Sequence, residues 1–297
     1  MRADDPGLAF HIVDVFTATP FSGNPLAVVL GAEELSTQQM QRLASHFNLS
    51  ETAFPIFGEP QVEQVGADYR LRIFTTETEV PFAGHPSIGS AWLLRELGLV
   101  VPRDGHVVQL CGAGPLPIRF DADTLTLSGG TPSWGRPVEA APLLAAAGLR
   151  AADGIGPALV CSTGLPFAVV RVSGEALTRC SPDLSLLRGE HLRDLGTDGV
   201  YVVAWDNLAD PVRARMFAGD VTEDAATGSA ALACGVYLTV TGVLPEGGTV
   251  AFVQGVEMGR PSQLTVTIEA AEGVPTRLQV TGGAVAVSSG RTAIPAA

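Results

Sequence analysis

Two long apolar stretches dominate the pattern of hydrophobic and polar positions along the chain. One runs from Ala225 to Leu244 without a charged side chain, and a shorter, largely apolar one covers 86–97. A helix that is apolar on every side is either buried all round or spans a membrane. The three glycines, the Ser and Thr residues and the acidic flanks of the longer stretch argue against a membrane span. We therefore predict two inner helices, each running through the middle of a folded domain.

The two predicted helices begin in a similar way. An acidic residue, Glu79 or Asp224, comes before a glycine, Gly84 or Gly228, and a polar residue follows each glycine. Free N–H groups and the positive end of the helix dipole make such a helix start a site for a carboxylate or a phosphate. The two starts lie about 140 residues apart. The repeated pattern predicts two similar domains whose inner helices point their N-termini toward a shared cleft.

Short β-type segments surround both apolar stretches. In the first half they fall within 8–16, 26–30, 49–57, 69–76, 106–112, 116–120 and 123–128, and the capping box Ser36–Gln39 opens a helix that ends near Asn48. In the second half we expect a helix at 138–147, further helical structure around Asp183 to Asp194, and strands near 157–160, 166–172, 199–205, 212–217, 249–254, 262–269, 276–280 and 283–287. Many short strands with few helices predict an α+β protein in which each half is a strongly curved, β-barrel-like sheet around one helix.

The strongest break in the pattern is the segment from Ser128 to Pro137, which is rich in glycine and proline. Such segments are typical of domain boundaries. We therefore divide the chain into an N-terminal domain, 1–128, and a C-terminal domain, 129–280.

Composition narrows the class of protein. The 297 residues are enough for two domains with cores of their own, and 46% hydrophobic with 16% charged residues is typical of a globular chain. The 31 acidic and 18 basic residues give a net charge of −13, which disfavours binding to nucleic acids or anionic membranes because these need clustered Lys and Arg. The first residues, Met1–Pro6, lack the apolar core of a signal peptide, so we expect a cytoplasmic protein.

The cysteines do not form a metal-binding pattern. There are four, Cys111, Cys161, Cys180 and Cys234, and no two are spaced as C-x-x-C. We expect reduced, mostly buried thiols and no metal site.

Three side chains near the predicted helix starts can carry acid–base chemistry: Glu51, His85 and Asp224. Each also has a structural interpretation, as an acid in a solvated turn, a satisfied histidine and an acid favoured by a helix dipole. Together with Ser229 they form a coherent site that would hold an anionic substrate and move protons, and an apolar cleft would raise the pKa of Glu51 toward neutrality. Nucleophile-elbow, phosphate-loop and dinucleotide motifs are absent from the sequence. Proton transfer without a cofactor is the simplest remaining chemistry.

Several segments together resemble the PhzF-like isomerases of phenazine biosynthesis, which have the diaminopimelate-epimerase-like fold. The matching segments are 13–16, 23–28, 48–52, 72–75, 79–86, 215–217, 223–231 and 254–262. They extend from the first predicted strand almost to the C-terminus. The resemblance implies two pseudo-symmetric domains with the active site in the cleft between them, the return of residues 281–297 to the first domain, and a homodimer.

The resemblance also implies roles for individual residues. Glu51, in the Ser-Glu-Thr motif, would be the catalytic acid–base group, with His85 and Asp224 as its partners. The substrate-binding positions would be Ser50, Gly84, Gly228 and Ser229. The implied reaction moves a proton on trans-2,3-dihydro-3-hydroxyanthranilate or a similar small cyclic carboxylic acid.

Other activities of the fold stay open to different degrees. Its racemases and epimerases use two cysteines, whereas here Ala83 precedes Gly84 and the Asp224–Ser229 loop has no thiol. Cys234 lies further along the predicted helix, where we expect core packing. A two-thiol epimerase is therefore disfavoured. An isomerase or epimerase of another amino-acid-like secondary metabolite and a non-catalytic small-ligand-binding protein remain as alternatives.

Overall fold

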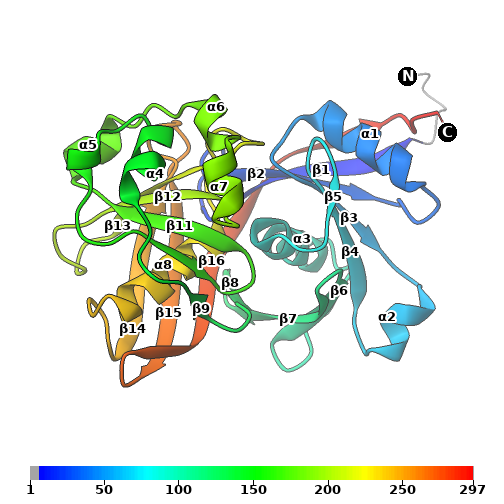
Figure 1. Cartoon of the computed structure of the whole chain (residues 1–297). Helices are drawn as coiled ribbons and strands as arrows, with labels where there is room; N and C mark the ends of the chain where they lie inside the picture. The colour runs from blue at the N-terminus through cyan, green and yellow to red at the C-terminus, as the bar shows by residue number, and fades with distance from the viewer. Residues whose placement is uncertain (1–6, 297) are drawn as a thin grey trace. The chain divides into compact units, whose positions relative to one another are not determined.

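The computed structural model describes residues 7–296, so Met1–Pro6, which carried the expectation about a signal peptide, lies outside the described residues. Contacts within the chain divide it into two compact units (Figure 1). Unit 1 comprises the residues up to Leu127 together with those from Gly282 onward, and unit 2 comprises Ser128–Thr281. Unit 1 thus combines the blue-to-green part of the chain with its red end.

Unit 1 is a closed barrel around one helix. Its elements are β1 (Leu8–Val15), β2 (Asn24–Leu30), α1 (Thr37–Phe47), β3 (Thr52–Ile56), α2 (Pro60–Gln64), β4 (Tyr69–Phe74), β5 (Glu79–Val80), α3 (Gly84–Glu96), β6 (His106–Cys111), β7 (Gly114–Asp121), β8 (Thr124–Ser128) and the last part of β16 (Val274–Thr292). The strand order is β1-β2-β3-β4-β6-β7-β8-β16, and pairing of β1 with β16 closes it. The helix α3 runs through the middle, in contact with β1, β2, β3 and β6, and α1 packs outside on β3 and β4 (Figure 1).

The barrel wall lies close against α3. The helix is buried from Gly84 to Ala91, as a helix with no polar face must be. Gly89 permits the approach, because a Cβ atom there would lie 2.7 Å from Val15 Cγ2 and 2.8 Å from Leu26 Cδ2.

Unit 2 also wraps its strands around one inner helix. Its elements are β9 (Ser133–Trp134), α4 (Ala140–Ala146), the 3₁₀ helix η1 (Ala151–Asp153), β10 (Leu159–Ser162), β11 (Pro166–Arg171), α5 (Gly174–Thr178), α6 (Leu184–Leu187), α7 (Glu190–Asp194), β12 (Gly199–Ala204), β13 (Val212–Phe217), α8 (Gly228–Val240), β14 (Gly247–Gln254), β15 (Ser262–Ala271) and the first part of β16. The strand order is β16-β15-β14-β13-β12-β11-β10-β9, and α8 packs on β9, β10, β11, β14 and β15. A second apolar core lies between the sheet and the outer helices α4 to α7.

The two units share their topology. In each, outer helices connect a parallel pair, β2–β3 or β11–β12, which is followed by an antiparallel pair, β3–β4 or β12–β13. The inner helix then connects a second parallel pair, β4–β6 or β13–β14. Each inner helix therefore starts beyond the carboxyl end of the strand before it. The predicted α+β architecture with a curved sheet around each inner helix is confirmed.

Local expectations need three corrections. The segments 276–280 and 283–287, predicted as separate strands, are one strand, β16. The glycine pair between them does not turn the chain; Gly282 instead makes room for a ring, since a Cβ atom there would lie 2.2 Å from Phe16 Cδ1.

The helix expected from Pro86 begins at Gly84, because the first turn of a helix tolerates proline at its third position. The short elements α2, β5 and β9 were not predicted.

The interpretation of the apolar stretches as inner helices agrees with the structure. The long stretch forms α8, in which Gly228 and every residue from Ala230 to Thr239 are buried. Within residues 7–296 no helix has the length and hydrophobicity needed to cross a membrane. All four cysteines are free and buried, as predicted.

Candidate functional site

Three side chains of unit 1 meet at the start of α3. His85 Nδ1 lies 3.5 Å from Glu51 Oε2 and 3.5 Å from Asn24 Nδ2. Asn24 is the first residue of β2, Glu51 directly precedes β3, and His85 is the second residue of α3. The structure therefore brings together two of the predicted catalytic residues, Glu51 and His85.

Local backbone geometry places Glu51 there. Asn48 ends α1 in the left-handed conformation, with φ 53° and ψ 39°, which turns the chain back toward the sheet. The strand β3 then pairs in parallel with β2, with Thr52 opposite Ala27. Because the starts of parallel strands lie at the same edge, Asn24 and Glu51 share the edge at which α3 begins.

His85 is held as a neutral imidazole. The side chain is 5% exposed, and burial lowers its pKa to about 3. At neutral pH its contact with Glu51 is therefore not an ion pair, although the distance alone would allow one. At 3.5 Å both contacts of Nδ1 are at the long limit of a hydrogen bond.

The other ring nitrogen of His85 differs from Nδ1 in its surroundings. Nε2 is buried and has no hydrogen-bond partner among residues 7–296. A buried polar atom without a partner costs about 1–3 kcal/mol. A substrate group that hydrogen bonds to Nε2 would recover this free energy. Glu51, whose side chain is 19% exposed, lies within reach of the same ligand.

In unit 2, the predicted catalytic residue Asp224 lies on the loop before α8. Asp224 is 7% exposed, and its Oδ2 accepts a hydrogen bond of 2.6 Å from the hydroxyl of Thr227. Its backbone N–H donates to Met216 O, and its carbonyl accepts from Gln254 Nε2 at 2.9 Å. The carboxylate therefore lies on a loop that is fixed at both its side chain and its backbone.

Neither inner helix is capped by its own N-cap side chain. The N-cap of α3 is Ala83, which has no polar group, and the N-cap of α8 is Thr227, whose hydroxyl donates to Asp224 instead of accepting from the helix. Neither N-cap side chain therefore accepts from the first N–H groups of its helix, and an anion suits the positive end of the dipole.

Three of the four predicted substrate-binding residues lie at these two helix starts. Gly84 and Gly228 are the first residues of α3 and α8, Ser229 is the second residue of α8, and Ser50 lies in the turn before β3. Their roles stay predictions. The same holds for the expectation that the unit 1 and unit 2 groups face one another across a cleft.

Sequence reasoning did not assign Asn24, Thr227 or Gln254. All three lie in the segments that carried the family resemblance, which was a signal that could have identified them. Their contacts depend on strand pairing, which a linear motif does not show.

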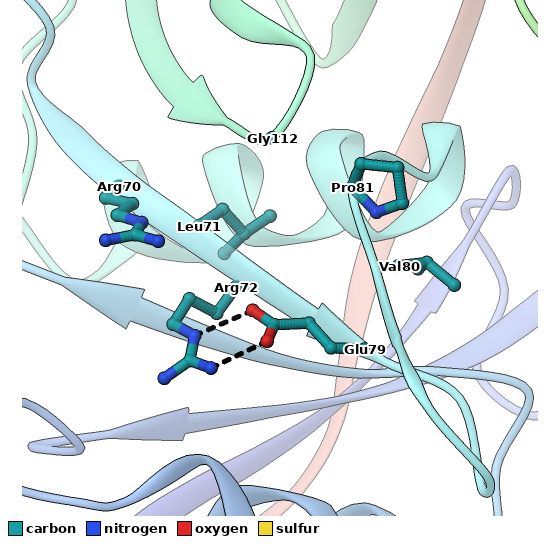
Figure 2. A pocket seen from close by; sticks show the side chains of 7 residues that line it. All are labelled: Arg70, Leu71, Arg72, Glu79, Val80, Pro81 and Gly112. Atoms are coloured by element: carbon teal, nitrogen blue, oxygen red, sulfur yellow. Dashed lines mark hydrogen bonds and ion pairs between the residues drawn. The ribbon is translucent and has the colours of Figure 1, made fainter.

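A separate pocket of unit 1 has a volume of about 310 Å³ and is drawn in Figure 2. Its lining residues are Arg70, Leu71, Arg72, Glu79, Val80, Pro81 and Gly112. Arg72 donates two hydrogen bonds of 2.7 Å to the carboxylate of Glu79, and Arg70 lies 3.2 Å from Glu59. Because both guanidinium groups already have carboxylate partners, and because Glu51 and His85 do not line it, this pocket is not the candidate site.

Within the described part of the chain, no cluster of three or more His, Cys, Asp or Glu side chains is arranged to hold a metal ion.

Comparisons with known proteins place the chain in a family. The family model described as phenazine biosynthesis-like protein, PhzC-PhzF, matches residues 13–290. The chain is 34% identical over 288 residues to a trans-2,3-dihydro-3-hydroxyanthranilate isomerase of Pseudomonas aeruginosa, with 95% of this chain and 98% of that protein covered. It is 31% identical over 292 residues to the uncharacterized isomerase YddE of Escherichia coli K12, with 92% and 94% covered.

Solved structures show that the fold is shared. A PhzF-family phenazine biosynthesis protein of Bacillus anthracis superposes with a TM-score of 0.84 at 24% identity and covers 97% of this chain and 99% of that one. A predicted epimerase of Pseudomonas aeruginosa gives 0.80 at 30% identity, with 96% and 99% covered. The chain therefore belongs to the PhzC–PhzF family of phenazine biosynthesis-like proteins, and its enzyme class is that of an isomerase.

Proposed function

We propose that this protein moves a proton within a small cyclic carboxylic acid by acid–base catalysis at Glu51, without a cofactor or a metal. The substrate is trans-2,3-dihydro-3-hydroxyanthranilate or a close relative. The observation that carries the proposal is the contact between Glu51 and a neutral, buried His85 whose Nε2 has no partner within residues 7–296.

Glu51 is the proton carrier in this proposal. Its carboxylate takes a proton from a ring carbon of the substrate and returns it at another position of the conjugated system, which leaves a ketone. A positioned side chain of this kind contributes roughly 10²- to 10⁴-fold to a rate. The carboxylate is partly exposed, so a substrate can reach it, and its Oε2 is the atom nearest His85.

His85 acts as a hydrogen-bond partner and not as a charge. Because burial keeps the imidazole neutral, it offers one donor and one acceptor. Nε2 binds a polar group of the substrate near the reacting carbon. Asp224 and Ser229 bind further polar groups, and the N–H groups that begin α3 and α8 hold the substrate carboxylate.

The relatives support this choice of substrate class. Three proteins named trans-2,3-dihydro-3-hydroxyanthranilate isomerase are 33–34% identical to this chain over at least 95% of its length. Family members named only as uncharacterized isomerases match at similar identity, so another amino-acid-like metabolite is the alternative substrate.

The decisive variant is Glu51→Gln, which keeps the size of the side chain and removes the base. Incubation in deuterated water with trans-2,3-dihydro-3-hydroxyanthranilate, followed by NMR, measures turnover and deuterium incorporation together. We expect a loss of roughly 10²-fold or more, with substrate binding retained in calorimetry. The control is Glu77→Gln, which changes an exposed carboxylate of unit 1.

Three outcomes separate the alternatives. Unchanged turnover in Glu51→Gln would refute the role of Glu51. Binding without turnover in the unmodified protein would favour a non-catalytic ligand-binding protein. Deuterium exchange into other cyclic amino acids or hydroxy acids, but not into this substrate, would favour an enzyme of another metabolite.

The proposal includes a homodimer, which the family resemblance implies, and keeps the expectation that the protein works in the cytoplasm. Sedimentation velocity at low micromolar concentration tests the assembly, and a monomer with full activity would remove that part.

A further inference from the structure

We propose that Gln254 is a positioning residue whose side-chain amide directs the Thr227 hydroxyl toward Asp224 and so fixes the orientation of that carboxylate. The inference rests on the proposed function only for what Asp224 does with a substrate. The hydrogen-bond chain itself is a property of unit 2 alone.

Gln254 is the last residue of β14 and is fully buried. Its Nε2 donates to the carbonyl of Asp224 at 2.9 Å and to Thr227 Oγ1 at 3.1 Å. Its Oε1 accepts from the backbone N–H of Thr227 at 3.3 Å and from the hydroxyl of Tyr201 at 3.1 Å. Both ends of the amide are therefore occupied by groups that surround Asp224.

Backbone partners fix which end of the amide is which. A backbone carbonyl only accepts and a backbone N–H only donates, so the NH₂ group must face Asp224 O and the oxygen must face Thr227 N. The opposite orientation of the amide would break both contacts. The assignment of Oε1 and Nε2 thus follows from the neighbours, which a lone glutamine side chain would not allow.

This assignment fixes the direction of the next hydrogen bond. Because Nε2 donates to Thr227 Oγ1, the hydroxyl proton of Thr227 is left to point elsewhere. It points to Asp224 Oδ2, 2.6 Å away, a short distance typical of a hydroxyl that donates to an ionised carboxylate. The chain therefore runs in one direction, from Tyr201 and Gln254 through Thr227 to Asp224.

The surrounding loop is too tightly held for these groups to move apart. Gly255 has φ +76°, and a Cβ atom there would lie 2.6 Å from Ala225 O. Ser262 Oγ donates to the same carbonyl at 2.9 Å. A buried and fully paired network of this kind rigidifies the groups at its end, because the low local dielectric strengthens each bond.

Unit 1 contains a similar arrangement that ends differently. Gln109, on the strand after α3, accepts from Tyr69 at 3.2 Å and donates to Ser87 Oγ at 3.0 Å. Ser87 then donates to the carbonyl of Ala83 at 2.8 Å. This chain braces the first turn of α3 and leads to a backbone carbonyl, so Gln109 is a matched control for Gln254.

A double-mutant cycle tests the proposal on the full-length protein. The variants are Gln254→Met, Thr227→Val, their combination, and Thr227→Ser, each first checked for folding by thermal unfolding. Gln254→Met and Thr227→Val should each lower kcat/KM about tenfold, mostly through kcat, since each removes a hydrogen bond that orients Asp224. The double variant should be little worse than either single one, and Thr227→Ser should restore most of the activity.

The control cycle combines Gln109→Met with Thr227→Val. Here the two effects should multiply, because Gln109 does not act through Thr227. If the effects of Gln254→Met and Thr227→Val also multiply, or if Thr227→Val leaves kcat unchanged, Gln254 is only a structural brace and the proposal is wrong.

A measurement without substrate keeps this test separate from the proposed function. Hydrogen exchange of the amides from Asp224 to Ala231 in the free protein should speed up about tenfold in Gln254→Met and in Thr227→Val, with no further gain in the double variant. Gln109→Met should leave this segment unchanged. Failure of turnover in the unmodified protein, with this exchange pattern intact, would overturn the proposed function and not the hydrogen-bond chain.

Discussion

The two units hold the segments that lead into their inner helices with the same ion pair, but they bury it to different degrees. In unit 1, Arg72 donates two hydrogen bonds to Glu79, and in unit 2, Arg215 donates two to Glu223, at 2.7–2.8 Å. Arg72 lies on β4 and Arg215 on β13, and each stacks on the phenylalanine two residues later.

The surroundings of the two pairs differ. The side chains of Arg215 and Glu223 are 7% and 14% exposed, against 15% and 35% for Arg72 and Glu79. Arg215 also donates to the carbonyls of Leu177 and Cys180. Burial is the largest single influence and opposes the charge of Arg215, but the hydrogen bonds to Glu223 and the nearby negative groups together outweigh it and raise the pKa of Arg215. The pair of unit 2 is therefore part of a core, whereas the pair of unit 1 borders a surface pocket.

The largest expected effect is that of Arg215→Met. It leaves Glu223 buried without its partner and removes the donor from two carbonyls, so we expect a loss of about 3–5 kcal/mol in the free energy of unfolding. Urea denaturation measures this, and Arg215→Met with Glu223→Gln should recover part of the loss. A loss below about 1 kcal/mol would show that the buried pair does not differ from a surface pair.

The second-largest effect concerns the loss of stability in acid that is caused by His85 of unit 1. The folded-state pKa of His85 is about 3, below its ordinary value of 6.5, so the unfolded chain takes up a proton that the folded protein refuses as pH falls below 6.5. Stability is lost progressively over this range. His85→Gln removes that linkage. Between pH 7 and pH 5 the variant should therefore lose about 2 kcal/mol less of its free energy of unfolding than the unmodified protein loses.

Urea midpoints measured from pH 7 to pH 4 test this expectation. His191→Gln, which changes an exposed histidine of unit 2, is the control. If the urea midpoint falls with pH equally steeply in His85→Gln and in the unmodified protein, the imidazole is not held neutral.

The smallest effect is that of Arg72→Met, which should lower the free energy of unfolding by about 1 kcal/mol, because a partly exposed ion pair contributes little. Hydrogen bonds from Arg72 lower the pKa of Glu79 below its ordinary value of 4.5. The contribution of the pair is therefore present above pH 4.5 and is lost as pH falls below it. In urea denaturation, the free energies of unfolding of Arg72→Met and of the unmodified protein should converge in acid. A difference that stays constant with pH would contradict a stabilising ion pair between Arg72 and Glu79.

Sequence patterns predicted the fold better than they predicted the contacts between side chains. The uncharged run of α8 identified an inner helix directly, and the capping box at Ser36 is present with both of its hydrogen bonds. Gly282 was misleading, because a glycine that makes room for a ring and a glycine that turns the chain look alike in a sequence.

For the candidate site, the contact of Glu51 with His85 followed from the resemblance. The direction of the Gln254 chain did not, because it depends on the backbone carbonyl of Asp224 and the backbone N–H of Thr227, which meet the side-chain amide only in the folded protein. Glu223 was recognised only as an acidic flank of the apolar run, since its partner Arg215 lies on a strand whose orientation the sequence leaves undefined.

The strand β16 has a consequence for biosynthesis. Its residues 274–281 pair with β15 of unit 2, and its residues 284–292 pair with β1 of unit 1. The barrel of unit 1 therefore cannot close until the final segment of the chain has been translated, although its other strands are made first. During synthesis one edge of β1 stays unpaired until residues 284–292 are made, after the strands of unit 2. The unit that carries Glu51 and His85 therefore completes its native sheet last.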